Sequence, residues 1–329
     1  MKTSLSADLL RAMRDARNAQ PLRGHTPEGF QEPTAYLPAN MARSIPACMK
    51  TSSLPAAFNQ DGTLRRTPKG VPSGTSLTMD RAVIANSRVN AAGARVLVVE
   101  DNRTAHAVSN KNDIALQRVP VEFRTVAPAV FQDANLEGET EQGEIGRPGN
   151  IGGGSELTLA SLPVSIARLD WNQAITKGVR FAVSRGDLRL IGDEEFCEEV
   201  AIALTLGAAR AADEALLSAI LAASPSAFTL AKAASAGLAL PELRGLVGTA
   251  GASGTIAEDG SLRAAGIVAE LTADSSQTLI GAWDRAAIAI RDDIDIHFKR
   301  VGLNGGLEVI AWINLLPLVP DATKFWTVA

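Results

Sequence analysis

The chain has 329 residues, 46% of them hydrophobic, which is enough apolar material for about two domains with sizeable cores, and its formal net charge is -4. No apolar run approaches the ~18 residues of a membrane span and the N-terminus lacks the apolar core of a secretion signal, so we expect a cytosolic product without membrane contact. The two distant cysteines, Cys48 and Cys197, exclude a disulfide framework and a thiol-rich metal site, and an aromatic content of 4% leaves few platforms for stacking single-stranded nucleic acid.

Charge is distributed unevenly along the chain. Residues 1–120 carry 16 basic and 9 acidic side chains, residues 121–160 carry 2 and 7, and residues 161–329 carry 14 and 20. A basic N-terminal part and an acidic remainder favour contacts between copies of the chain, or with a polyanion on one side only.

The N-terminal part predicts one helix and a long irregular stretch. Residues 5–19 have the period of an amphipathic helix. Its apolar stripe consists of Leu5, Leu9, Met13 and Ala16. We expect this helix either to dock on a partner or neighbouring copy or to fray at the terminus. Residues 21–72 hold eight of the sixteen prolines, so they form no core of their own and are either a linker or an arm ordered by other subunits.

The middle of the chain predicts strands around a polar excursion. Residues 95–100 predict a buried strand, and residues 119–130 predict a second strand bent by its prolines. Residues 132–156 contain almost nothing that can be buried, after which strand character returns over residues 157–166. This order predicts a long projecting two-stranded loop that is not stable alone. A further strand is expected over residues 171–184.

A helix over residues 193–224 is the longest predicted element, and the rest of the chain is organised around it. Asp193 can cap its first turn, and the following glutamates suit the positive end of the helix dipole. Its ~30 residues span roughly 45 Å, and Pro225 stops it. Ten alanines allow close packing, and apolar residues occupy most faces. The expected solvated stripe consists of Arg210, Asp213 and Glu214.

The C-terminal third predicts a compact α/β piece and a hairpin. Four short elements are expected, namely helices over residues 230–236 and 241–247 and strands over residues 266–271 and 279–290. Residues 294–298 alternate between apolar and polar side chains, and a glycine-rich turn at residues 302–306 leads into a returning strand. Phe325 and Trp326 are expected to lie in the body of the protein.

No catalytic, cofactor-binding or metal-binding residue is predicted. The Gly149–Ser155 stretch has the glycine content of a phosphate loop, but a strand follows it and the Lys-Ser/Thr pair is missing, so we expect a loop tip. His25 and His106 have no recognisable nucleophile beside them. The acidic residues of the polar excursion are expected to be solvated or to lie at a subunit contact, rather than to act in acid–base catalysis; they are Glu137, Glu139, Glu141 and Glu144.

One acidic strand could supply metal ligands. Its candidate ligands are Asp292, Asp293, Asp295 and His297. The same alternation is explained by a half-buried strand whose inner face consists of Ile294, Ile296 and Phe298. No second cluster of ligands stands nearby in the sequence, so the half-buried strand is the preferred interpretation.

The order of these elements resembles the major capsid proteins of tailed bacteriophages, which have the Hong Kong 97 fold. The run ITKGVRFAVSRGDLRLIGDEEF leading into EEVAIALTLGAARAADEALLSAI looks like the strand, turn and spine helix of that family's peripheral domain. The run AAGIVAELTADSSQTLIGAWDRAAIAIRDDIDIHFKR looks like its axial-domain strands, and VPDATKFWTV is similar to its C-terminal tails.

The resemblance implies an α+β fold with an N-terminal arm, an extended two-stranded loop, a peripheral domain with a long spine helix, and an axial domain. The implied division is residues 1–120 for the arm and leading strands, 121–170 for the extended loop, 171–224 for the peripheral domain with the spine helix, 225–293 for the axial domain, and 294–329 for the peripheral-domain hairpin and tail.

The resemblance also implies a function. The chain is expected to be a non-enzymatic structural protein without cofactors, whose hexamers and pentamers form an icosahedral head around double-stranded DNA. Localisation in the virion after assembly in the host cytoplasm is implied, with scaffold, portal and cement proteins as further partners and only non-specific contact with DNA. No lysine occurs between Lys111 and Lys177, so the Lys–Asn weld that some members make from the extended loop is not expected.

Two other interpretations are kept. The first is an encapsulin-like compartment, which would contain a cargo protein instead of DNA. The second is an α+β enzyme that uses the Gly149–Ser155 loop and the face of Asp293, Asp295 and His297. A purified monomer near 34.4 kDa would favour the enzyme over either shell.

Overall fold

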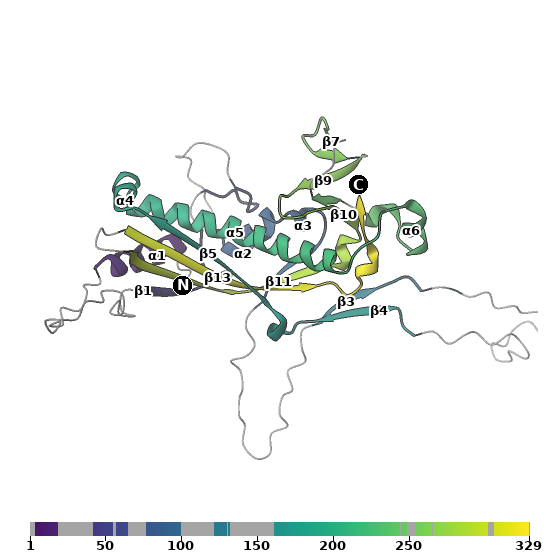
Figure 1. The fold of residues 1–329 in the computed structure, drawn as a ribbon, viewed down its shortest axis with the longest axis horizontal. Coiled ribbons are helices and arrows are strands. Elements are labelled where there is room, and N and C mark those ends of the chain that lie inside the picture. Colours follow the sequence, from purple (N-terminus) through teal and green to yellow (C-terminus); the bar gives the residue numbers. More distant parts are fainter. Residues whose placement is uncertain are drawn as a thin grey trace, which may run out of the picture.

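The computed structural model describes residues 4–18, 42–54, 57–64, 77–99, 122–129, 131, 161–243, 245–248, 254–264, 266–301 and 306–328. Helices and strands both contribute, so the α+β class is confirmed, and the expected order of long helix, α/β piece and terminal hairpin is present. The elements form a main body, a second body and a two-stranded arm (Figure 1). Within the described residues no helix is both long and apolar enough to cross a membrane.

The main body is built on a six-stranded sheet. Its strands are β1 (Ala42–Cys48), β2 (Arg95–Val99), β5 (Ile175–Val183), β11 (Ala287–Arg291), β12 (Asp293–Val301) and β13 (Gly306–Leu318). The long strand β13 pairs antiparallel with β5 along one side and with β11 and β12 along the other. Strand β12 also pairs with β1, and β11 pairs with β2 in parallel.

The predicted C-terminal hairpin is confirmed by the pairing of β12 with β13, although residues 302–305 of its turn lie outside the described residues. Ile294, Ile296 and Phe298 are buried in the main core. The preferred interpretation of the alternation, a half-buried strand, is therefore confirmed. Asp292 lies between β11 and β12. Its backbone N–H donates to the carbonyl of Val99, at the end of β2.

Helix α5 (Asp193–Ala222) runs along the main body and packs on the sheet (Figure 1). The predicted cap is wrong, because Gly192 is the capping residue and makes no side-chain bond, whereas Asp193 is the first helical residue and pairs with Arg17 at 2.5 Å. The helix ends at Ala222, two residues before the predicted end. Ser224 has a φ of 54°, so the backbone has left the helical region there, just before Pro225.

Helix α1 (Leu5–Asn18) lies in the core of its own chain and packs against α5, β1 and β12. Its predicted apolar stripe is almost completely buried. Both expectations for this helix, docking on another molecule and fraying, are therefore wrong. The reason is that α5 and β12 supply a packing surface from far along the sequence. Two further helices, α2 (Met79–Asn86) and α3 (Arg88–Ala91), also contact α5, and α4 (Arg185–Ile191) precedes it.

The second body contains another six-stranded sheet, in the order β14-β10-β6-β9-β8-β7. Its elements are α6 (Leu230–Ser235), β6 (Leu246–Gly248), β7 (Gly254–Ile256), β8 (Leu262–Ala264), β9 (Ile267–Leu271), β10 (Thr278–Gly281) and β14 (Phe325–Val328). Phe325 and Trp326 are buried as predicted, because β14 pairs with β10.

Two predictions in this region are wrong. Residues 241–247 do not form a helix; a 3₁₀ turn at Leu240–Glu242 is followed by β6. Residues 279–290 are not one strand, because β10 ends at Gly281, a 3₁₀ turn follows at Trp283–Arg285, and β11 then joins the other sheet. The cause is Trp283, which is fully buried and donates its indole N–H to the carbonyl of Gly245 at 2.8 Å.

The arm is formed by β3 (Glu122–Val126) and β4 (Val164–Arg168), which pair antiparallel. The first strand is shorter than predicted, and the second starts and ends later than the predicted residues 157–166. A 3₁₀ turn at Trp171–Gln173 leads from the arm to β5. Figure 1 shows both strands leaving the body beside β11 and continuing along the long axis of the molecule.

Candidate assembly surfaces

The arm is attached to the body at its base and carries exposed apolar side chains beyond it. Phe123 packs in a small core with residues of β11 and β13, among them Ala287 and Leu316. Arg95 of β2 also lies over the Phe123 ring, 5.9 Å from its centroid. The base is therefore fixed to the main sheet.

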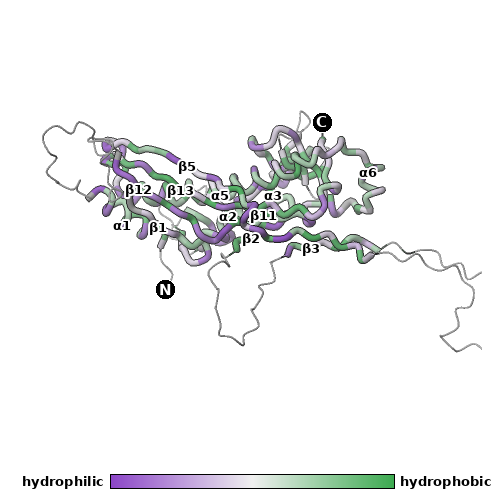
Figure 2. The backbone as a smooth tube through the Cα atoms, turned by 60° about the horizontal axis from the view of Figure 1, so that its bottom comes forward, coloured by the Kyte–Doolittle hydropathy of each residue, from purple (hydrophilic) through white to green (hydrophobic). Residues whose placement is uncertain are grey.

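Beyond the base, the arm carries large apolar side chains that are exposed to between 43% and 96%. Those exposed on the arm are Val126, Phe131, Leu162 and Ile166, and Phe131 is 96% exposed. Figure 2 shows apolar residues continuing along the arm as it leaves the body. Exposed apolar side chains gathered on a projecting element mark a surface for contact with another molecule.

Other exposed apolar side chains lie at the two ends of the molecule, and those of Ile175, Val179 and Trp312 lie on β5 and β13 of the main sheet. In the second body, Ile256, Val268 and Leu271 are exposed on β7 and β9, and Leu230 is exposed at the start of α6. At the other end, Leu190 of α4 is exposed next to Arg189. These positions are more scattered than those on the arm, and single exposed apolar side chains are ordinary on protein surfaces.

Asp213 of α5 is the one predicted stripe residue that is buried, with 2% of its surface exposed. Its carboxylate accepts hydrogen bonds from the Ser87 hydroxyl at 2.6 Å and from the backbone N–H groups of Arg88 and Val89 at 2.8 and 3.2 Å. Burial raises the pKa of Asp213, and these hydrogen bonds act in the opposite direction. The carboxylate therefore ties the start of α3 to the middle of α5.

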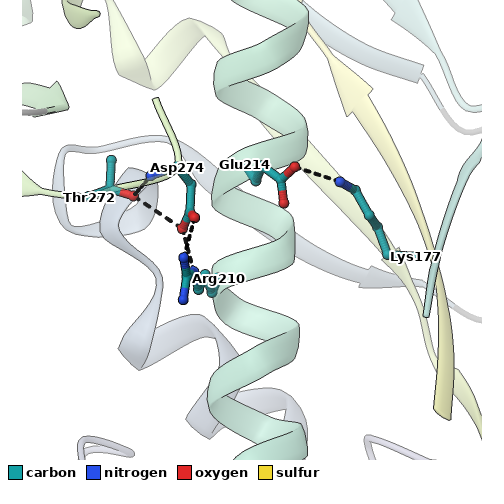
Figure 3. A network of polar contacts seen from close by, with 5 residues as sticks. All are labelled: Lys177, Arg210, Glu214, Thr272 and Asp274. Atoms are coloured by element: carbon teal, nitrogen blue, oxygen red, sulfur yellow. Dashed lines mark hydrogen bonds and ion pairs between the residues drawn. The ribbon is translucent and has the colours of Figure 1, made fainter. Parts of the chain in front are cut away.

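The other two stripe residues form ion pairs on either side of α5 (Figure 3). Arg210 makes a bidentate pair with Asp274 of the second body, at 2.6 and 2.5 Å. Glu214 pairs with Lys177 of β5 at 2.6 Å. The Arg210 guanidinium lowers the pKa of Asp274. One ion pair thus joins α5 to the second body, and the other joins it to its own sheet.

The acidic strand does not assemble a ligand set. Asp292 accepts hydrogen bonds from the Cys48 thiol at 2.8 Å and from the Lys50 backbone N–H at 2.9 Å, and burial together with this contact raises the pKa of Cys48. Asp293 and Asp295 are exposed, and the His297 ring packs edge-on against Trp312 with centroids 5.0 Å apart. Among the described residues no group of three or more His, Cys, Asp or Glu side chains is placed to hold a metal ion.

The remaining sequence candidates lie outside the described residues. These are the Gly149–Ser155 loop, His25, His106, and the four glutamates of the polar excursion, Glu137, Glu139, Glu141 and Glu144. Sequence reasoning missed the roles of Asp213 and Arg210. Asp213 lies one helical turn from Ala209, Leu216 and Leu217, and an aspartate on such an apolar face was the available signal for a buried carboxylate.

No protein-family model and no curated protein sequence matches the chain. Solved structures do match. A structure titled as the capsid of an empty GTA particle has 11% identity and a TM-score of 0.44, covering 80% of this chain and 94% of its own. Mycobacterium phage Che8 gives 14% identity and a TM-score of 0.38, with 63% and 83% covered. The procapsid of satellite phage P4 gives 10% and 0.38, with 75% and 95% covered.

Proposed function

We propose that this chain is a major capsid protein, whose copies assemble into the icosahedral head that encloses the double-stranded DNA of a tailed bacteriophage. The observation that carries the proposal is the arm, which is fixed to the body by Phe123 and leaves Val126, Phe131 and Leu162 uncovered. A two-stranded ribbon is marginal in water on its own. Contact with a neighbouring copy supplies the missing cover.

The gain from such contact is substantial. Burying a fully exposed Phe or Leu side chain contributes about 1.5–3 kcal/mol, and a closed shell repeats the contact for every copy. The exposed apolar side chains of the arm give each chain a surface that a neighbouring subunit can cover.

We also propose how the bodies correspond to the family's domains. The main body with α5 is assigned as the peripheral domain, the second body as the axial domain, and the arm as the extended loop. Self-association into hexamers and pentamers, assembly in the host cytoplasm, scaffold, portal and cement partners, and non-specific contact with DNA belong to the same proposal.

The test is assembly of the purified chain and of two matched variants at the arm. Wild type is expected to form closed particles in negative-stain microscopy. Phe131→Asp is expected to remain folded by circular dichroism but to sediment as small species, because the arm surface then carries a charge. Phe131→Leu keeps the surface apolar and should assemble.

Three results would contradict the proposal. Wild type could remain a monomer near 34.4 kDa, or Phe131→Asp could assemble as well as Phe131→Leu. The third result concerns particles isolated from the native source, in which nuclease-protected DNA is expected. A packaged protein in place of DNA would contradict the phage head and indicate the encapsulin-like compartment.

A further inference from the structure

The two bodies are packed tightly together at one part of their junction. Trp283 and Phe325 are almost fully buried, with ring centroids 5.2 Å apart in an edge-on arrangement, and both belong to the main core. The indole N–H of Trp283 is bonded to the Gly245 carbonyl, in the segment that leads into β6. This part of the junction therefore has no free space and behaves as a fixed contact.

Another part of the junction is hollow. A cavity of about 330 Å³ lies between α3 and α5 on one side and residues 271–274 of the second body on the other. Two apolar side chains line it from opposite bodies without filling it: Leu206 of α5 is half-buried, and Leu271 at the end of β9 is 56% exposed. Moving the two bodies together here would remove apolar surface from water.

Two ion pairs span this hollow part. Arg210 of α5 holds Asp274 through both carboxylate oxygens, and Arg88 of α3 holds Glu270 of β9 at 3.3 Å. The Asp274 carboxylate is also oriented by Thr272, whose hydroxyl lies 3.4 Å from it and accepts the Asp274 backbone N–H at 3.1 Å (Figure 3). Charged side chains thus set the separation of the bodies at this point.

We propose that the Arg210–Asp274 and Arg88–Glu270 pairs are a latch that holds the second body in one of two positions. When the latch is released, the second body pivots about the Trp283–Phe325 contact, and Leu271 moves toward Leu206 to close the hollow. Both pairs are formed at the present separation and must rearrange on closure, so their release frees the angle between the two bodies without unfolding either core.

Disulfide trapping tests this device in the full-length purified chain. Asn86→Cys and Ala273→Cys, which line the hollow from opposite bodies and leave Leu206 and Leu271 in place, are combined with Cys48→Ser. The native Cys197 is buried and its pKa is raised to about 12, which keeps it unreactive. With the latch intact, cross-linking under mild oxidation is expected to be slow. Adding Asp274→Asn and Glu270→Gln should accelerate it several-fold, since each exposed pair is worth about 0.2–1 kcal/mol, or up to about fivefold.

The ion pair at the start of α5 supplies the matched control. Arg17→Met removes an ion pair of 2.5 Å from the same helix, but Arg17–Asp193 does not span the junction, so the cross-linking rate should stay at its starting value. Salt at 1 M should accelerate trapping when the latch is present and have no effect when it has been removed. Immediate trapping with the latch intact, an unchanged rate in the Asp274→Asn/Glu270→Gln variant, or equal acceleration by Arg17→Met would each overturn the proposal.

Discussion

Asp213 of α5 and Asp274, which pairs with Arg210 of α5, experience opposite environments. Asp213 is enclosed, and burial raises its pKa above the ordinary 3.8, whereas the Arg210 guanidinium lowers the pKa of Asp274. A carboxyl with a raised folded pKa binds its proton more tightly in the folded state. Its contribution to stability is present below the unfolded pKa and is lost as the pH rises through the folded value. The pKa of Asp274 is lowered in the folded state, so its contribution to stability is present above the unfolded pKa and is lost as the pH falls through the folded value.

This difference predicts opposite pH dependences for two variants. Asp213→Asn should lower the free energy of unfolding by about 1–3 kcal/mol, because one backbone donor at the start of α3 loses its acceptor. The advantage of wild type over Asp213→Asn should shrink as the pH rises above 3.8. Its advantage over Asp274→Asn should be present above pH 3.8 and disappear as the pH falls. Urea unfolding between about pH 2.5 and 7 measures both, and slopes of the same sign would contradict the assignment.

The two strands at one edge of the second sheet, β14 and β10, approach closely at a glycine. Gly281 closes β10 opposite Phe325 of β14, and a Cβ atom at Gly281 would lie 2.6 Å from the Lys324 carbonyl oxygen and in contact with the Phe325 ring. The strand pairing that buries Phe325 therefore depends on the absence of a side chain at this position.

Alanine at two glycines should have opposite effects. Gly281→Ala is expected to destabilise the protein by about 1–3 kcal/mol, because it forces β14 away from β10. Gly207→Ala is the control: no atom lies within 4 Å of the added Cβ in the middle of α5, and the change should stabilise the helix by about 1 kcal/mol. Thermal unfolding of the two variants checks the prediction, which fails if Gly281→Ala melts at or above the wild-type temperature.

Helices and strands were predicted correctly where the pattern that defines them lies in consecutive residues, and they were missed where it depends on residues far apart in the sequence. Helix α5 and the β12–β13 hairpin were predicted because their periodicity is written in consecutive residues, as in Ile294, Ile296 and Phe298. The break between β10 and β11 was missed, since an uninterrupted apolar run hides the turn that Trp283 forms by bonding to Gly245. The packing of α1 was missed because its partners lie on α5 and β12.

The candidate assembly surface on the arm was also predicted only in part. The polar stretch of residues 132–156, which indicated a projection between two strands, lies outside the described residues, and the structure shows the strands that flank it in sequence, β3 and β4, paired with each other. The exposure of Phe131 and Leu162 was not predicted, because an apolar residue at a strand end is normally assigned to a core. The hydrogen-bond partners of Asp213 could not be predicted, because they depend on the position of α3, which only the folded chain provides.

At the scale of the whole molecule, part of the charge separation is neutralised inside one copy. The basic N-terminal region and the acidic remainder favoured contacts between copies, yet Arg17 of α1 pairs with Asp193 at the start of α5 in the same chain. The attraction of α1 to α5 therefore helps to fold the subunit. The apolar side chains of the arm remain exposed among the described residues of one copy.

Because another copy of the chain is expected to cover the exposed apolar side chains of the arm, we expect the stability of the folded state to depend on protein concentration. Anything that binds the folded state stabilises it by mass action, and here the binding partner is another copy of the chain. The unfolding temperature of wild type, equilibrated at each dilution before heating, should rise over a hundredfold range of concentration, with about 1.4 kcal/mol for each tenfold change per association step. Phe131→Asp, which lacks the apolar arm contact, should unfold at one temperature throughout, and Phe131→Leu should follow wild type. Calorimetry distinguishes the cases, and an unfolding temperature for wild type that is independent of concentration and equal to that of Phe131→Asp would show that the arm needs no neighbour.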